Sequence, residues 1–395
     1  MTSQLITGIG ELTTQDADTS AQSQRRHNMA LVIEDDRVAW IGEASASPAA
    51  DLRIDVGGRA VLPGWVDTHS HIIFAGDRSA EFESRMAGES YAAGGINVTV
   101  AATRAAPEEA LIKNAERLRH EAELQGTTFV ETKTGYGLTT ESEVVSARAA
   151  AAVADTVTYL GAHVVPPDVD RRDYIDLVTG PMLAAVAPFV QYVDAFCEVG
   201  AFTVDESREV LLAGRAAGLE LRLHGNQLTA GGGVALAVEL GAVSVDHCNH
   251  LSPTDIELLS SSNTVATLLP ACDLSTRMPF APARQLLDAG ARISLATNCN
   301  PGTSYTTSMA FNVATAVLQM GLTIDEAVWA ATRGAAVAVG RETGTESVGS
   351  LQTGGLASLQ VLNAPSVSHL AYRPGVPLTI ATWRRGQKVR AHVDV

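Results

Sequence analysis

Two histidines one residue apart, His69 and His71, close the segment V-L-P-G-W-V-D-T-H-S-H that begins at Val61. Side chains two residues apart on an extended backbone point to the same side, so both imidazoles would face one volume. Imidazole nitrogen is a common ligand of zinc and iron. An isolated H-x-H motif is frequent by chance, so the pair predicts a metal site only if further ligands reach the same place.

Further candidate ligands stand where other strand-like runs end. His224 follows L-E-L-R-L, His247 closes V-S-V-D-H, and T-N-C-N-P-G, residues 297–302, follows a third run. Three or four such ligands would hold a divalent ion and leave one position for water. For His224 the ligand interpretation is preferred to that of a polar strand end. For His247 a metal-binding and a catalytic role are equally compatible with its position.

The elements that must position these residues are strand-like runs alternating with Ala-rich helical stretches, which is typical of repeated βα units. Eight such strands predict a (β/α)8 barrel over residues 61–348, with the functional residues at the C-terminal ends of the strands. An open doubly wound sheet is disfavoured because no G-x-G-x-x-G follows an early strand. The predicted strands are 65–69, 128–131, 156–161, 192–197, 220–224, 242–247, 264–269 and 292–297.

Helix starts and a long gap add detail to this barrel. Residues 107–124 begin P-E-E, which places a proline and two acids in a first helical turn. T-E-S-E at residue 140 and T-V-D-E at residue 203 each resemble a capping box. Residues 72–125, between the first two strands, must hold an inserted loop as well as a helix.

Both ends of the chain are rich in short strands and turns. The first 60 residues include L-V-I-E-D-D-R-V-A-W-I-G, two alternating runs joined at Asp35 and Asp36, which predicts a hairpin. Residues 349–395 contain similar runs, and neither end has enough strands for a stable sheet alone. We therefore expect residues 1–60 and 349–395 to form one small composite β-sandwich domain.

Composition limits the classes of partner. The 395 residues include 44 Asp and Glu against 28 Lys and Arg, a formal net charge of −16, which disfavours nucleic acid as a partner. The N-terminus lacks a basic start with a long apolar core, and no stretch resembles a membrane span, so we expect a cytoplasmic protein without a membrane partner. The four cysteines are scattered without a C-x-x-C, which predicts buried reduced thiols.

Several longer segments resemble the amidohydrolase superfamily of metal-dependent hydrolases. They are L-P-G-W-V-D-T-H-S-H-I-I-F-A-G-D-R, S-Y-A-A-G-G-I-N-V-T-V-A-A-T-R, E-T-K-T-G-Y-G-L, Y-L-G-A-H, D-A-F-C-E, C-N-P-G-T-S and A-P-S-V-S-H-L-A-Y-R. The resemblance covers nearly the whole chain. It implies hydrolysis of the ring amide of 4-imidazolone-5-propanoate to N-formimino-L-glutamate, as in histidine degradation. It also implies a small imidazolone carboxylic acid as substrate and a homodimer.

The resemblance further implies the roles of individual residues. One divalent metal ion, zinc or iron, would be held by His69, His71, His224 and the residue at position 298, while His247 would orient the carbonyl and the incoming water. Arg78 would bind the propionate through its planar fork. The other substrate-binding positions are Tyr91, Tyr136, His163, Gln227, Asn300, Gly302 and Thr303, of which the last three also fit a turn.

Two positions depart from the superfamily pattern and remain catalytic candidates beside His247. Gln227 stands where an acid usually follows the fifth-strand histidine, and glutamine cannot take up a proton. Asn298 stands where the superfamily has a metal-binding aspartate that shuttles protons. Its carbonyl can still coordinate a metal, but it carries no charge and is no useful base. Three interpretations stay open: an enzyme of this type with reduced turnover, a catalytically silent or ligand-binding homologue, and a hydrolase of a related imidazolone or hydantoin acid.

Overall fold

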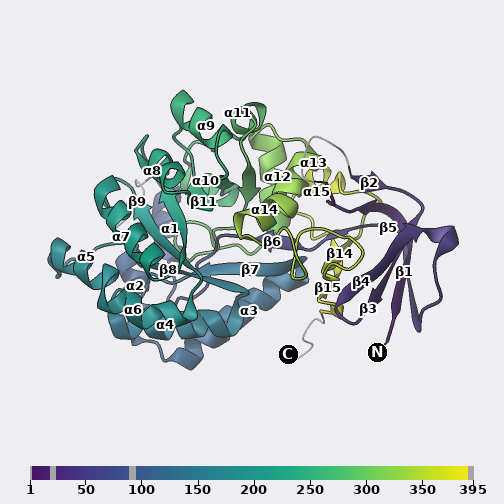
Figure 1. Cartoon of the computed structure of the whole chain (residues 1–395), viewed down its shortest axis with the longest axis horizontal. Coiled ribbons are helices and arrows are strands. Elements are labelled where there is room, and N and C mark those ends of the chain that lie inside the picture. The colour runs from purple at the N-terminus through teal and green to yellow at the C-terminus, as the bar shows by residue number, and fades with distance from the viewer. Residues whose placement is uncertain (1, 18–23, 89–94, 390–395) are drawn as a thin grey trace. The chain divides into compact units, whose positions relative to one another are not determined.

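The computed structural model of the chain describes residues 2–17, 24–88 and 95–389 (Figure 1). The chain divides into two compact units. The barrel unit comprises Thr68–Arg119 and Val130–Thr307, and the terminal unit comprises Met1–Asp67, His120–Phe129 and Ser308–Val395. The division into domains at residues 60 and 349 stays a prediction.

Eight strands form one sheet in chain order, as expected for a (β/α)8 barrel. A parallel bridge between Ser70 and Cys299 joins the two edges of this sheet, and beside it the Asn298 N–H donates to the His69 carbonyl at 2.9 Å. The barrel prediction is confirmed, and each observed strand end lies within two residues of the predicted one. The strands are β6 (Trp65–Asp67), β7 (Thr127–Lys133), β8 (Thr156–Ala162), β9 (Tyr192–Cys197), β10 (Glu220–Gly225), β11 (Ser244–His247), β12 (Val265–Leu268) and β13 (Ile293–Leu295).

Burial on both faces explains why these strands read as apolar runs. Every residue of β8 and of β12 is buried. A charged side chain inside such a strand must find a partner within the protein, because an unpaired buried charge is very costly. Lys133 in β7, Asp194 in β9 and Asp246 in β11 are all fully buried. The inner face of the barrel therefore holds a set of paired charges.

Helices flank the barrel strands, and Figure 1 shows α4 and α7 beside β8 and β9. The capping box predicted at Thr203 is confirmed, since Thr203 and Glu206 exchange hydrogen bonds with each other's N–H groups. The one predicted at residue 140 is wrong. Thr139 is the N-cap there and accepts from the Ser142 N–H, while Glu143 accepts N–H groups of the preceding loop and not that of the cap residue. The helices are α1 (Ser79–Met86), α2 (Ile96–Ala105), α3 (Glu108–Leu124), α4 (Thr140–Val153), α5 (Arg171–Thr179), α6 (Pro181–Val186), α7 (Val204–Ala216), α8 (Gly233–Glu239), α9 (Pro253–Ser260), α10 (Pro270–Thr276) and α11 (Ala283–Asp288).

The insertion between the first two barrel strands is more helical than expected. It contains α1 and α2 as well as the predicted helix, which is observed as α3. The segment between α1 and α2 includes residues 89–94, and Tyr91 therefore lies outside the described residues.

Strands from both chain ends come together in the terminal unit, as predicted. The expected β-sandwich would have two packed sheets, whereas these strands all join one mixed sheet because β5 pairs with strands of both chain ends. The hairpin is confirmed, with Glu34 opposite Arg37. The two chain ends meet where β5 pairs antiparallel with β14, seen as purple and yellow strands in Figure 1. All the strands belong to one hydrogen-bonded sheet, whose order is β16-β15-β14-β5-β1-β3-β4 with β2 beside β1. They are β1 (Gln4–Thr13), β2 (Arg25–Arg26), β3 (Met29–Glu34), β4 (Arg37–Glu43), β5 (Leu52–Pro63), β14 (Leu359–Leu362), β15 (Thr379–Arg384) and β16 (Gln387–Lys388).

One hydrophobic cluster stabilises this mixed sheet. It includes Ile6, Leu31, Val61 and Trp383, each almost inaccessible to solvent. Four further helices complete the terminal unit: α12 (Met309–Gln319), α13 (Ile324–Ala330), α14 (Arg333–Ala338) and α15 (His369–Tyr372).

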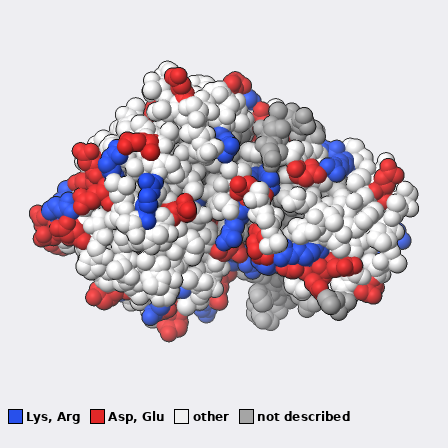
Figure 2. Space-filling view, in the orientation of Figure 1, with Lys and Arg blue, Asp and Glu red and all other residues white. Residues whose placement is uncertain are grey.

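The surface carries both signs of charge. On the face shown in Figure 2, acidic and basic side chains alternate in small groups. Within the part of the chain that the structure describes, no helix combines the length and apolar character needed to cross a membrane. All four cysteines are buried and free, as predicted.

Candidate metal centre

Three of the predicted metal ligands meet at the C-terminal ends of the barrel strands. His69, His71 and His224 each offer a ring nitrogen, and these atoms lie within 4.8 Å of one another. The Nε2 atoms of His69 and His71 are 3.1 Å apart. All three rings are buried. The arrangement brings together ligands from the first and fifth barrel strands, as the sequence predicted.

Two carboxylates lie behind the histidines and orient them. Asp246 Oδ2 lies 2.7 Å from His69 Nδ1, and Asp194 Oδ2 lies 3.0 Å from His224 Nδ1. The other oxygen of Asp194 accepts the backbone N–H of His224 at 3.1 Å. A carboxylate on Nδ1 leaves Nε2 as the metal-facing nitrogen and fixes the ring orientation.

The protonation states suit a metal ligand set. Burial lowers the pKa of His69 and of His71 well below the usual value, aided by the charge of Lys133 near His69 and by His69 near His71. Both rings are therefore neutral at pH 7 and offer lone pairs. Nε2 of His224 is buried and has no hydrogen-bond partner among the described residues, which a bound ion would supply. The histidines and aspartates form a buried metal site.

A buried charge network beneath this site was not found by the sequence analysis. The Nζ of Lys133 lies 3.1 Å from Glu131 Oε1 and 3.0 Å from Asp194 Oδ2. The Nη2 of Arg222 lies 3.5 Å from Asp246 Oδ2. Apart from the histidines, two cations and three carboxylates leave one net negative charge, which favours a bound cation. The usable signal was a charged residue within several of the apolar strands, as in F-V-E-T-K and Y-V-D-A-F.

Replacing Asp246 by asparagine is expected to weaken metal binding by about 10- to 100-fold, because His69 loses the charged partner that orients its ring. Competition with a chelator of known affinity measures this. The matched control is Asp155→Asn, which removes the 2.6 Å ion pair with Arg119 elsewhere in the barrel unit. Equal weakening in both variants would contradict a specific role for Asp246.

Two of the three predicted catalytic residues, Asn298 and His247, have unusual backbone conformations. Asn298 has a φ of 50° and His247 a φ of 82°. Asparagine tolerates the left-handed region, whereas histidine there is less common, and such strain is typical of functional sites. The ring of His247 lies with its centroid 5.4 Å from that of His224. Burial lowers the pKa of His247 well below its usual value, and the charge of His224 adds to this effect.

A single cavity joins these groups to most of the predicted substrate-binding residues. Its volume is about 50 Å³. The cavity lies within the barrel unit. The described substrate-binding candidates all line it except Gly302, which lies against Arg78. The lining residues are His71, Arg78, Ile96, Tyr136, His163, Phe196, His224, Gln227, His247, Asn298, Asn300 and Thr303.

Arg78, the predicted carboxylate-binding residue, is held from two sides. Its Nε and Nη2 donate to the two carboxylate oxygens of Glu81 at 2.8 and 2.6 Å. A Cβ added at Gly302 would lie 2.2 Å from Nη1 of Arg78, so only glycine lets the guanidinium lie flat against this turn. Arg85 contributes as well, by donating to the Gly302 carbonyl at 3.1 Å.

The remaining predicted residues build the walls of the cavity. Nδ1 of His163 lies 3.0 Å from the Gly135 carbonyl, and burial together with the charge of His224 lowers the pKa of His163 to about 3. His163 is therefore neutral, with its proton on Nδ1 and its Nε2 an acceptor. Oδ1 of Asn300 accepts the N–H groups of Gly302 and Thr303, both at 2.8 Å. The side chain of Asn300 thus builds the turn that seats Arg78.

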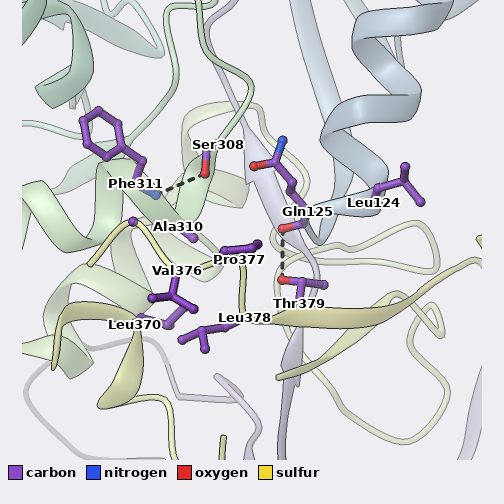
Figure 3. A pocket seen from close by; sticks show the side chains of 11 residues that line it. Leu124, Gln125, Ser308, Ala310, Phe311, Leu370, Val376, Pro377, Leu378 and Thr379 are labelled. Carbon is purple, nitrogen blue, oxygen red and sulfur yellow. Dashed lines mark hydrogen bonds between the residues drawn. The ribbon is translucent and has the colours of Figure 1, made fainter. Parts of the chain in front are cut away.

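A second cavity, in the terminal unit, has the opposite character (Figure 3). It encloses about 130 Å³ and is lined mainly by apolar side chains such as Leu370, Val376 and Leu378. Its polar groups are engaged, since Ser308 Oγ accepts from the Phe311 N–H and Thr379 Oγ1 donates to the Gln125 carbonyl. None of the described residues that line it is titratable. It therefore lacks the groups that the metal centre brings together.

A buried acid in α10, Asp273, makes stability depend on pH. Asn249 Nδ2 donates to Asp273 Oδ1 at 2.7 Å. Oδ2 of Asp273 and the side-chain oxygen of Asn249 are buried and have no hydrogen-bond partner in the part of the chain described. Burial raises the pKa of Asp273 from 3.8 to about 7. A protonated Asp273 could donate to Asn249, so the native state favours the acid form.

Folding stability should accordingly fall as the pH rises from about 4 to about 7, because the native state holds a proton that the unfolded chain has released. A pKa displaced this far corresponds to about 4 kcal/mol. Asp273→Asn keeps the hydrogen bond and removes the ionisation. We expect its stability, relative to the unchanged protein, to be higher at pH 8 than at pH 5 in urea unfolding. A difference that does not vary with pH would contradict this account.

The chain matches known proteins over nearly its whole length. Residues 214–389 match the amidohydrolase family. The chain is 61% identical over 389 residues to an imidazolonepropionase from Saccharopolyspora erythraea, with 98% of this chain and 99% of the relative covered. It is 59% identical over 403 residues to an imidazolonepropionase from an Arthrobacter species, with 98% and 100% covered. A solved structure, a mutant of atrazine chlorohydrolase from Arthrobacter aurescens complexed with zinc and atraton, shares the fold. Its TM-score is 0.70 at 17% identity, with 99% and 97% of the two chains covered.

Proposed function

The chain belongs to the imidazolonepropionase family of the amidohydrolases, and from this premise we propose that it hydrolyses the ring amide of 4-imidazolone-5-propanoate to N-formimino-L-glutamate. The observation that carries the proposal is the convergence of His69, His71 and His224 beside a cavity that also contains Arg78. A metal-binding group and a carboxylate-binding group thus lie within reach of one small ring.

The proposed metal is one divalent ion, zinc or iron, held by the three histidines and by the side-chain carbonyl of Asn298. Neutral imidazoles and an amide oxygen fit both ions, and zinc in the structurally similar chlorohydrolase supports zinc. Such an ion lowers the pKa of a bound water from about 15.7 towards 7 and so supplies a nucleophile at neutral pH.

The chain's own residues bind and orient the substrate in this proposal. Arg78 binds the propionate, and Tyr136 and His163 contact the ring. The neutral His247 forms a hydrogen bond with the ring carbonyl or the incoming water, and Gln227 positions the ring N–H. Asn300, Gly302 and Thr303 form the floor. Tyr91, which lies outside the described residues, is proposed as a further substrate contact on the family resemblance alone.

The second candidate function is ligand binding without turnover. It is favoured by Asn298 and Gln227, which both lack the proton-accepting group expected at these positions. A hydrolase of a related imidazolone or hydantoin acid is the third. A homodimer and a cytoplasmic location stay predictions, and light scattering on the purified protein tests the former.

The deciding experiment measures loss of freshly generated 4-imidazolone-5-propanoate and formation of N-formimino-L-glutamate by metal-loaded protein. The control is His224→Ala, which removes one proposed ligand from the cavity lining but leaves Arg78 and the other lining residues in place. Turnover that requires His224 supports the proposal. Stoichiometric metal and tight substrate binding without product would instead favour the ligand-binding homologue.

A further inference from the structure

Lys133 lies in an unusual place for a lysine. It ends β7, is inaccessible to solvent and contacts three carboxylates of the barrel interior. Its Nζ lies 3.1 Å from Glu131, 3.0 Å from Asp194 and 3.6 Å from Asp246. None of the roles proposed above uses this ammonium group, which is surrounded by oxygens as a metal ion would be.

Two of these carboxylates belong to a second group of potential metal ligands. One ligand atom each from Asp194, His224 and Asp246 lie within 4.8 Å of one another, and all three residues are buried. His224 is shared with the first group, where it meets His69 and His71. Carboxylate and imidazole ligands of this kind suit zinc and manganese. The barrel therefore contains donors for two neighbouring cations.

We propose that the ammonium group of Lys133 takes the place of a second metal ion and so limits the centre to one. A positive charge 3.0 Å from Asp194 and 3.6 Å from Asp246 uses the lone pairs that a second ion would need and repels that ion. With Lys133, the network has one net negative charge, which matches a single divalent ion. Without it, the network has two negative charges and an empty volume between them.

Replacing Lys133 by alanine tests the inference directly. The unchanged protein and Lys133→Ala are equilibrated with excess zinc, or with manganese, freed of unbound metal by gel filtration, and analysed for metal per chain. We expect one ion in the former and two in the latter. Addition of the metal should also raise the Tm of Lys133→Ala more than that of the unchanged protein, because the variant has an additional site in the folded state only.

The control is Arg119→Ala, which removes another buried cation of the barrel unit, one paired with Asp155 at 2.6 Å. It should leave the metal count unchanged. If Lys133→Ala does not fold, the double variant Lys133→Ala with Glu131→Gln replaces it. This variant keeps the network's net charge and retains Asp194, His224 and Asp246.

The inference rests on the metal centre of the proposed function. The number of metal ions per chain distinguishes a failure of the inference from a failure of that function. A rise from one ion in the unchanged protein to two in Lys133→Ala supports the inference. No gain, or two ions in the unchanged protein, overturns it. A starting count of zero contradicts the proposed metal-dependent function instead.

Discussion

Replacing Asn298 by aspartate is expected to increase the rate of ring hydrolysis by about 10²-fold, because a group able to accept a proton contributes about 10²- to 10⁴-fold in many enzymes. The backbone allows this change, since Asn298 has a φ of 50° and aspartate tolerates the left-handed region nearly as well as asparagine. The Asn298 N–H that donates to the His69 carbonyl is unaffected by the substitution. Metal affinity should rise as well, because the amide oxygen is replaced by a charged ligand.

The experiment compares kcat and metal affinity of the two proteins over a range of pH. The kcat of Asn298→Asp should fall on the acidic side as the new carboxylate becomes protonated. Asn300→Asp is the matched control, because it adds the same charge in the same cavity at a side chain that builds the turn. A similar increase in that variant would show that negative charge alone matters. An unchanged kcat for Asn298→Asp would mean that another group already accepts the proton.

Removal of the Arg78 guanidinium should reduce kcat/KM by about 10²-fold, mainly through KM. Each hydrogen bond to a charged group contributes about 1.5–3 kcal/mol, and a bidentate contact with the propionate would involve two. Arg78→Met keeps much of the side-chain volume and removes the charge. Arg78→Lys keeps the charge and loses the planar fork, so it should recover only part of the affinity.

Steady-state kinetics with 4-imidazolone-5-propanoate measure both variants, and the same assay with a ring that lacks the propionate provides the control. That substrate should be hydrolysed equally by all three proteins. If Arg78→Met leaves KM for the propionate substrate unchanged, Arg78 does not bind the carboxylate. The hydrolase of a related ring would then become the better hypothesis.

The fold was largely predictable because its signals are local. Each barrel strand is a short apolar run next to a helical stretch, and burial of both strand faces imposes that composition whatever the neighbours are. The same reasoning located His69, His71, His224 and His247, because parallel strands in a barrel bring their C-terminal ends to one face. The capping box predicted at residue 140 is absent and the N-cap is Thr139, since Thr139 and Thr140 are chemically alike and only the backbone distinguishes them.

The partners of the site residues were not predictable in the same way. Glu81 accepts hydrogen bonds from Arg78 three residues before it, a spacing visible in the sequence, yet the burial of Arg78 beside Gly302 required the structure. The positive φ angles of Asn298 and His247 likewise follow from how the barrel strands end in the turns around them.

His69 and His71 show most clearly which features the sequence determines and which require the tertiary structure. Their spacing and the apolar run before them determined from sequence alone that two imidazoles share one side of a strand end. Only the tertiary structure decided that Asp246 orients His69 across 177 residues, and that Lys133 lies among the carboxylates below. Alternation along a strand is a property of the local backbone, whereas the pairing of buried charges depends on which strands a closed barrel makes neighbours.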